Sequence, residues 1–168
     1  MPSHQEIDTK PEQPKQHDYL PPGVVRLFDG THLEEMLSDA MRLSTVDDEG
    51  WPHGAQLSVG ECLVLSSKRL LIAIWPTSHT SRNLRRDGRM SLSLVFENSI
   101  LEIRARATLR AENQTSLNLS VFQAEVEGVF QHRSSYADVV SGVTFKLHNP
   151  EQALERWREQ IDCLRRLA

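Results

Sequence analysis

The sequence is poor in the features that mark secreted, membrane-spanning and metal-dependent proteins. It has only two cysteines, Cys62 and Cys163, whose positions match neither a zinc motif nor a redox motif. No apolar run approaches the roughly 18 residues that a membrane-spanning helix needs, and the N-terminus lacks the apolar region of a signal peptide. We therefore expect a cytoplasmic protein with reduced thiols and no membrane partner.

Several catalytic motifs and any large excess of charge are also missing. The net charge is −4 and the isoelectric point about 6.0, so nucleic acid is not an expected partner. There is no GxGxxG, no GxxxxGK[ST] and no GxSxG, and the seven histidines do not fall at HExxH spacing. These absences argue against a dinucleotide fold, a P-loop, a serine hydrolase and a zinc site.

The length and the distribution of proline predict one domain with a tail. A chain of 168 residues fits a single domain with its own core. Residues 1–22 are polar and contain five of the eight prolines, so they bury too little apolar surface to offset the entropy of ordering. We expect a mobile tail over residues 1–22 and a single domain over residues 23–168 that ends in a helical extension.

Short strands separated by turn residues dominate the middle of the chain. Residues 100–110 alternate most clearly, with Glu102, Arg104 and Arg106 on the polar face, which is typical of a half-buried antiparallel strand. That polar row is either a solvated face, a dimer seam or a wall near a ligand. Tight hairpins between the strands favour a barrel or a sandwich. The expected strands cover residues 43–46, 51–59, 62–65, 69–75, 90–96, 100–110 and 143–147.

Helical signals lie near both ends of the chain. Thr31 and Glu34 have the spacing of a capping box, and an apolar stripe follows as far as Met41. Asn149 and Pro150 predict the start of the last helix. Residues 117–130 are ambiguous, because 117–121 also fit a strand. We expect a helix there, since Leu119, Phe122, Val126 and Val129 or Phe130 recur at helical spacing.

The chain between Arg69 and Arg89 is organised around hydroxyl groups. Pro76 ends an apolar strand, and four hydroxyl residues and several arginines follow it within ten positions. Such a segment before a short helix at 81–86 can hold an anion, because free N–H groups and the helix dipole favour negative charge. The simpler interpretation is that Ser78 or Thr80 only caps the helix. The polar residues are Thr77, Ser78, Thr80, Ser81, Arg82, Asn83, Arg85 and Arg86.

Three stretches, taken in order, carry a resemblance to a known family. They read LSTVDDEGWPHGAQLSV, LLIAIWPTSHTSRNLRRDGRMSLSLV and LEIRARATL, and together they cover residues 43–110. This order resembles the FMN-binding split barrel of the pyridoxamine 5′-phosphate oxidase-like superfamily. The resemblance implies a mainly β protein with a six-stranded antiparallel split barrel and flanking helices. It further implies a homodimer with FMN at the subunit interface.

The resemblance also implies which residues would contact FMN. Gln56, Leu57 and Ser58 match the strand that faces the isoalloxazine edge. Trp75, Pro76 and Thr77 match the strand end along the ribityl chain. The phosphate would lie on the crossing segment, at Ser78, Thr80, Ser81, Arg82 and Asn83.

Departures from the family pattern leave three functions open. Many flavin-binding members have a basic residue where this chain has Thr80, and the substrate-pocket residues of true pyridoxamine phosphate oxidases are not recognisable, so neither that reaction nor a substrate is assigned. We expect an FMN-binding protein, a flavin-dependent oxidoreductase of unassigned substrate. The string from His79 to Leu84 also resembles a heme-binding or heme-degrading branch of the superfamily. The third alternative is a cofactor-free dimer that has lost the flavin site.

Overall fold

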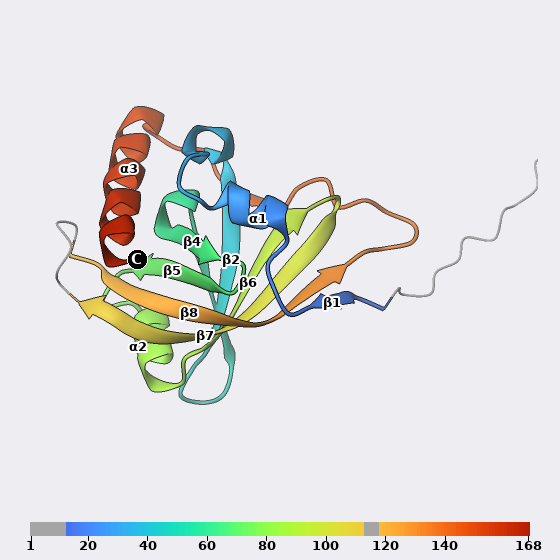
Figure 1. Ribbon diagram of the computed structural model, residues 1–168, viewed down its shortest axis with the longest axis horizontal. Helices are drawn as coiled ribbons and strands as arrows, with labels where there is room; N and C mark the ends of the chain where they lie inside the picture. Colours follow the sequence, from blue (N-terminus) through green and yellow to red (C-terminus); the bar gives the residue numbers. More distant parts are fainter. Residues whose placement is uncertain (1–12, 113–117) are drawn as a thin grey trace, which may run out of the picture.

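The computed structural model describes residues 13–112 and 118–168, which form one antiparallel sheet coiled into a split barrel with three α-helices around it (Figure 1). The fold class predicted from the sequence is confirmed. The elements are β1 (Lys15–His17), α1 (Pro22–Leu27), a 3-10 turn (Leu33–Met36), β2 (Asp39–Val46), β3 (Pro52–Leu57), a second 3-10 turn (Val59–Glu61), β4 (Cys62–Ser66), β5 (Arg69–Ile74), α2 (His79–Arg86), β6 (Arg89–Phe96), β7 (Ser99–Glu112), β8 (Ser120–His132), β9 (Val143–Thr144) and α3 (Pro150–Leu167).

The strand order explains why the barrel is split. The main path runs β3-β2-β6-β7-β8-β5-β4, with β1 added to β8 and β9 added to β2. The two end strands, β3 and β4, are consecutive in the chain and are joined through the turn Val59–Glu61. Ser58 caps this turn, because its N–H and its Oγ both donate to Glu61 Oε2, at 2.6 and 2.9 Å. The sheet therefore has a free edge at β3.

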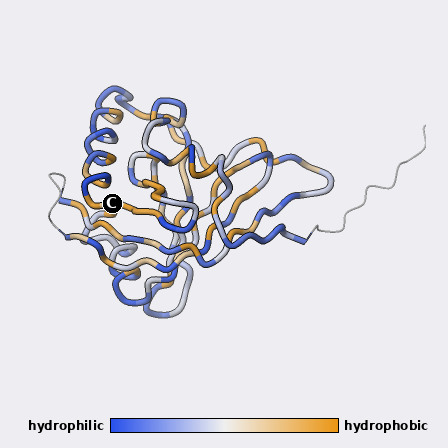
Figure 2. The backbone as a smooth tube through the Cα atoms, in the orientation of Figure 1, coloured by the Kyte–Doolittle hydropathy of each residue, from blue (hydrophilic) through white to orange (hydrophobic). Residues whose placement is uncertain are grey.

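Alternation along the strands fills the inside of the barrel with apolar side chains. In β2, Met41, Leu43 and Thr45 are buried, whereas Arg42 is exposed and Ser44 is half-buried. Burying a large aliphatic or aromatic side chain contributes about 1.5–3 kcal/mol. Figure 2 shows hydrophobic residues along the crossing strands and hydrophilic ones at most turns. The fully buried side chains of the strands include Leu43, Leu70, Leu71, Ile72, Leu92, Leu101 and Phe122.

Helix α3 covers the turn that joins the two sheet edges. Asn149 caps it, since Asn149 Oδ1 accepts the N–H of Gln152 at 3.1 Å, and Pro150 is its first residue. Its buried face includes Trp157, and it packs against the turn Val59–Glu61, β4 and β5. The approach is so close that a Cβ at Gly60 would lie 2.2 Å from Trp157 Cγ. The predicted last helix and its cap are confirmed.

The helix expected over residues 117–130 is wrong, because Ser120–His132 form strand β8. This strand pairs with β7 along its length and also with β5 and β1. Consecutive residues Ser120, Val121 and Phe122 are all buried, so the alternation that identifies a strand is lost there. Residue 117 lies outside the described part of the chain.

The helix expected from Thr31 is also largely wrong. Only the 3-10 turn Leu33–Met36 forms, and Met41 lies in β2 opposite Leu57. Asp29 Oδ1 accepts hydrogen bonds from both the N–H and the hydroxyl of Thr31, at 2.8 and 2.6 Å. The Thr31 hydroxyl is thus engaged before the turn begins, and the capping box with Glu34 does not form.

The sheet differs from the expected one at its ends. The resemblance implied a six-stranded barrel and the sequence pattern predicted seven strands, whereas the described residues contain nine. Strand β8 replaces the expected helix, β1 was not expected, and only Val143–Thr144 of the strand expected at 143–147 is paired. Lys15–His17 pair with β8 and Leu20 is buried, so residues 15–22 pack on the barrel rather than forming a free tail. Residues 1–12 of the expected tail lie outside the described residues. No described helix is long and apolar enough to cross a membrane.

Candidate functional site

The hydroxyl-rich crossing forms the start of α2. Ser78 is the N-cap, since its Oγ accepts the N–H of Ser81 at 3.1 Å and donates to the carbonyl of Trp75 at 2.8 Å. The carbonyl oxygen of Ser78 accepts the N–H of Arg82 at 3.2 Å. Of the two capping residues considered, Ser78 is therefore the cap, and the helix starts at His79, two residues earlier than expected.

Donors remain at this helix end after the cap is satisfied. The first-turn N–H groups of His79 and Thr80 have no acceptor within the helix. Ser81 is fully buried, and its Oγ lacks a hydrogen-bond partner among the described residues. Arg82 Nη1 donates to the carbonyl of Thr77 at 3.0 Å, which places the guanidinium beside the helix start. N–H groups, hydroxyls and a guanidinium are the donors that suit a phosphate dianion.

The two other arginines of α2 are engaged elsewhere. Arg85 Nη2 donates to Glu112 Oε1 at 2.6 Å and to Ser120 Oγ at 2.8 Å. Arg86 Nη2 donates to the carbonyls of Val46 and Asp47. Arg82 is the arginine of α2 that lies nearest the start of the helix, where its guanidinium donates to the Thr77 carbonyl.

Asn83 holds α2 on the barrel through a buried hydrogen bond. Its side chain is buried, and Nδ2 donates to Thr45 Oγ1 at 3.0 Å. Thr45 is itself buried in β2. A buried pair of this kind fixes the helix relative to the sheet, because breaking it leaves a polar group unsatisfied. Among the predicted phosphate residues, Asn83 thus occupies a supporting position.

Helix α2 and strand β3 meet through two imidazoles. The ring centroids of His53 and His79 lie 5.6 Å apart with the planes at 24°. Beside them is a hollow of about 540 Å³. Its lining carries both signs of charge and consists of Asp47, Asp48, Glu49, His53, His79, Arg82, Asn83 and Arg86.

The three residues predicted to face a flavin ring lie on β3 and just after it, in different environments. Gln56 is exposed on the outer face, whereas the side chain of Leu57 is buried and only its backbone could contact a ligand at the edge. Ser58 is engaged with Glu61, whose pKa is raised by burial. In the described residues, β3 pairs with β2 alone, so its other edge presents free N–H and C=O groups.

The residues predicted along the ribityl chain connect β5 to α2. Trp75 is 53 % exposed, and the Arg156 guanidinium carbon lies 5.3 Å from the centroid of its ring. Pro76 is half-buried and Thr77 is exposed. The segment thus leads from the barrel core to the start of α2, with the side chains of Trp75 and Thr77 accessible.

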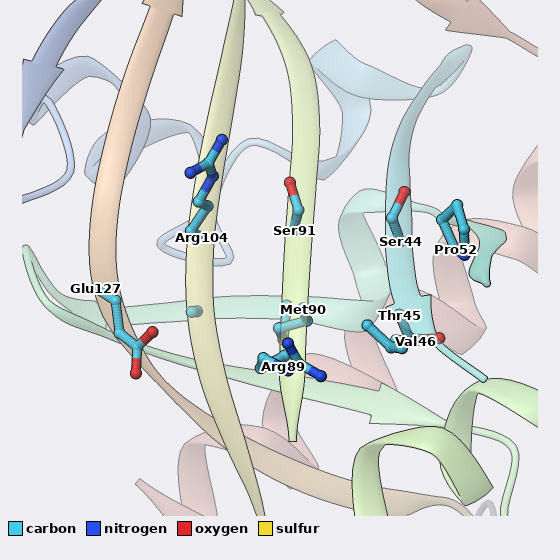
Figure 3. A pocket seen from close by; sticks show the side chains of 10 residues that line it. Ser44, Thr45, Val46, Pro52, Arg89, Met90, Ser91, Arg104 and Glu127 are labelled. Carbon is cyan, nitrogen blue, oxygen red and sulfur yellow. The ribbon is translucent and has the colours of Figure 1, made fainter. Parts of the chain in front are cut away.

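A second depression was not predicted from the sequence. We call it the outer-face slot; it lies on the outside of β2, β6 and β7 and measures about 240 Å³. Figure 3 shows Ser44, Ser91 and Arg104 on three neighbouring strands of this face. The polar row on residues 100–110 was visible in the sequence, but its register against β6 and β2 was not. The lining residues are Ser44, Thr45, Val46, Pro52, Arg89, Met90, Ser91, Arg104, Ala105 and Glu127.

Charged groups around the slot are mostly paired. Arg104 Nε donates to Glu102 Oε1 at 2.7 Å, and His132 Nε2 lies 3.2 Å from Glu102 Oε2. Arg104, followed by His132, holds the pKa of Glu102 below its usual range. The described residues contain no cluster of three His, Cys, Asp or Glu side chains that could hold a metal ion.

Several known proteins are similar to this chain in sequence or fold. The protein YclD of Bacillus subtilis, described as uncharacterized, is 33 % identical over 144 residues, which cover 85 % of this chain and 94 % of YclD. A candidate pyridoxamine 5′-phosphate oxidase of Lactobacillus delbrueckii superposes with a TM-score of 0.56 at 19 % identity, covering 71 % of this chain and 99 % of its own. HupZ of Group A Streptococcus gives a TM-score of 0.50 at 14 % identity, with 66 % and 94 % covered.

The sequence profile described as pyridoxamine 5′-phosphate oxidase matches residues 32–144. This range runs from the turn before β2 to β9, and so includes the whole main path of the sheet, α2 and the free edge of β3. The chain therefore belongs to the pyridoxamine 5′-phosphate oxidase family.

Proposed function

We propose that the protein binds FMN and acts as a flavin-dependent oxidoreductase. The observation that carries the proposal is the start of α2, where the fully buried Ser81 Oγ has no partner and Arg82 lies beside free backbone N–H groups. An unsatisfied buried hydroxyl is costly, and a bound phosphate oxygen would satisfy it. Membership of the pyridoxamine 5′-phosphate oxidase family also supports the proposal.

Two elements of this chain, α2 and β3, would bind different parts of FMN. His79 and Thr80 would donate backbone N–H groups to the phosphate, Ser81 its hydroxyl and Arg82 its guanidinium. The isoalloxazine carries donors and acceptors along one edge, and the free edge of β3 near Gln56 offers complementary backbone groups. When bound, FMN would supply the capacity to accept and donate a pair of electrons.

A homodimer is part of the proposal. Trp51 and Trp75 are large aromatic side chains that are 67 % and 53 % exposed. A single chain leaves the edge of β3 open to water, whereas a second copy would cover it and enclose a planar ring. Two-fold symmetry is the commonest way for identical chains to bury such a surface.

Titration with FMN and with riboflavin tests the phosphate site. We expect the wild-type protein to quench the fluorescence of FMN with micromolar affinity or better and to bind riboflavin more weakly. Arg82→Ala should weaken FMN about tenfold through loss of a charge-assisted hydrogen bond, while riboflavin binding stays the same. Arg166→Ala, at the exposed end of α3, is the matched control. FMN that stays unquenched by the wild-type protein would refute the proposal.

Heme is the second candidate, and the observation that favours it is His79. This side chain is exposed and its ring stacks on His53, so an accessible imidazole that could bind the heme iron lies at the start of α2. A heme site would give a Soret band on addition of hemin, and His79→Ala would remove it. A protein that gives neither flavin quenching nor a Soret band would be the cofactor-free dimer.

A further inference from the structure

We propose that Arg42 recognises an anionic group of the substrate, so that the outer-face slot takes small molecules with a carboxylate or phosphate on an apolar body. This inference rests on the proposed function, since it assigns the substrate side of the flavin site. It concerns residues that lie outside the phosphate site at α2.

The side chain of Arg42 occupies a position that is open only because residue 54 is glycine. Gly54 lies on β3, on the same face as Arg42 and one strand away. A Cβ at Gly54 would come within 2.6 Å of Arg42 Nη2 and 3.1 Å of Arg42 Cζ. The guanidinium therefore lies against the backbone of β3, the edge strand on which we propose that the isoalloxazine ring binds. Any larger residue at position 54 would move it.

The charge of Arg42 is available for a ligand. Among the described residues, the Arg42 guanidinium has no carboxylate or carbonyl partner, although it is exposed on a face rich in ion pairs. The neighbouring arginines are all paired: Arg104 with Glu102 at 2.7 Å, Arg106 with Glu127 at 2.9 Å, and Arg89 with Asp87 at 2.7 Å. An unpaired guanidinium held in one place suits a carboxylate or phosphate, which it can bind through two parallel hydrogen bonds.

Strand register surrounds Arg42 with hydroxyl groups and connects it to the slot. Arg42 lies opposite Ser93, and Ser44 lies opposite both Ser91 and Gly54. Ser44 and Ser91 line the slot. Gly54, against which the guanidinium lies, is therefore directly opposite Ser44, a residue that lines the slot.

The rest of the slot is suited to an apolar body. Val46, Pro52, Met90 and Ala105 are the apolar members of a lining that encloses about 240 Å³. Glu102 faces Ser93 across the strands and would repel an anion, but its carboxylate is already paired with the Arg104 guanidinium. A small ring with one acidic substituent matches this combination of apolar wall, hydroxyls and cation.

Binding of benzoate and of inorganic phosphate to the FMN-free protein tests this assignment by calorimetry. We expect saturable binding by the wild-type chain and a loss of at least about tenfold in Arg42→Ala, the usual effect of removing a charge-assisted pair. Gly54→Ala should weaken binding similarly although Arg42 is present, because the added methyl group would displace the flexible end of the Arg42 side chain from its position. Arg42→Lys should retain part of the affinity, and Arg166→Ala should change nothing. Benzamide, the neutral analogue, should bind independently of Arg42.

FMN and riboflavin titrations of Arg42→Ala separate the possible sources of the anion. Unchanged affinity for both flavins supports a substrate group at Arg42. Weaker FMN with unchanged riboflavin would mean that Arg42 holds the cofactor phosphate, which overturns the substrate assignment. Equal benzoate and phosphate affinity in wild type and Arg42→Ala would also overturn it. These outcomes differ from failure of the proposed function, in which the wild-type chain binds no FMN.

Discussion

Individual side chains at the start of α2 decide whether the helix can serve as an anion site. Ser78 ties the first turn to the end of β5, because its Oγ contacts both Ser81 and Trp75. Its neighbour Ser81 is left with a buried hydroxyl that nothing in the described chain satisfies. The cap that orders the helix start therefore uses the backbone N–H of Ser81 but leaves the hydroxyl of Ser81 without a partner.

Replacing the cap should weaken the fold by a measurable amount. We expect Ser78→Ala to lower the free energy of unfolding by about 1 kcal/mol, the usual contribution of an N-cap side chain. Ser78→Asn, which can accept the same hydrogen bond, should restore most of the loss. Urea titrations of the three proteins measure this directly. Equal stability of Ser78→Ala and wild type would show that the cap contributes nothing.

The thiol of Cys62 should be inert in the folded protein. Burial, reinforced by the negative charge of Glu61, raises the pKa of this thiol to about 12. The reactive thiolate is therefore scarce and inaccessible at pH 8. A chromogenic disulfide reagent should label Cys62 in denaturant but not in the native state, as judged by mass spectrometry of the labelled peptide. Rapid labelling of the native protein would contradict the buried position of β4.

At the scale of elements, the sequence predicted most of the strands because each hairpin carries its own turn residues. The β2–β3 hairpin is an example: Asp47 accepts hydrogen bonds from Glu49 and Trp51, and Gly50 has a φ of +88°. Strand β8 failed for the opposite reason. It lies between β7 on one side and β5 and β1 on the other, so its burial follows tertiary packing and not a local period.

The contact between α3 and the split of the barrel can be tested at Gly60. A Cβ there would overlap Trp157, which is buried and belongs to a rigid element. We expect Gly60→Ala to lower the free energy of unfolding by about 1–3 kcal/mol, the usual effect of overpacking. Gly54→Ala, where only the end of Arg42 must move, should be close to wild type. Similar melting temperatures for all three proteins would show that α3 does not close the barrel in this way.

At the scale of the whole molecule, the order of motifs predicted the barrel and the segment of the proposed anion site, but not how the side chains of that segment are arranged. The cap at Ser78 was one of two local alternatives in the sequence. The juxtaposition of His53 with His79 depends on how α2 is placed against the sheet, which no local pattern encodes. That of Arg42 with Gly54 follows from the register of the β2–β3 hairpin.

The proposed assembly predicts a dimer in solution. The exposed side chains of Trp51 and Trp75 would be covered by a second copy. Sedimentation equilibrium at micromolar concentration should give twice the mass of the 19.1 kDa chain. A stable monomer under those conditions would remove the partner from the flavin site and leave the edge of β3 open to solvent.

The absorption spectrum of the freshly purified protein, recorded again after incubation with FMN and removal of the free cofactor, tests the proposed flavin site most directly. We predict flavin bands that remain with the protein at one FMN per chain. A colourless protein after both steps would contradict FMN binding at the start of α2.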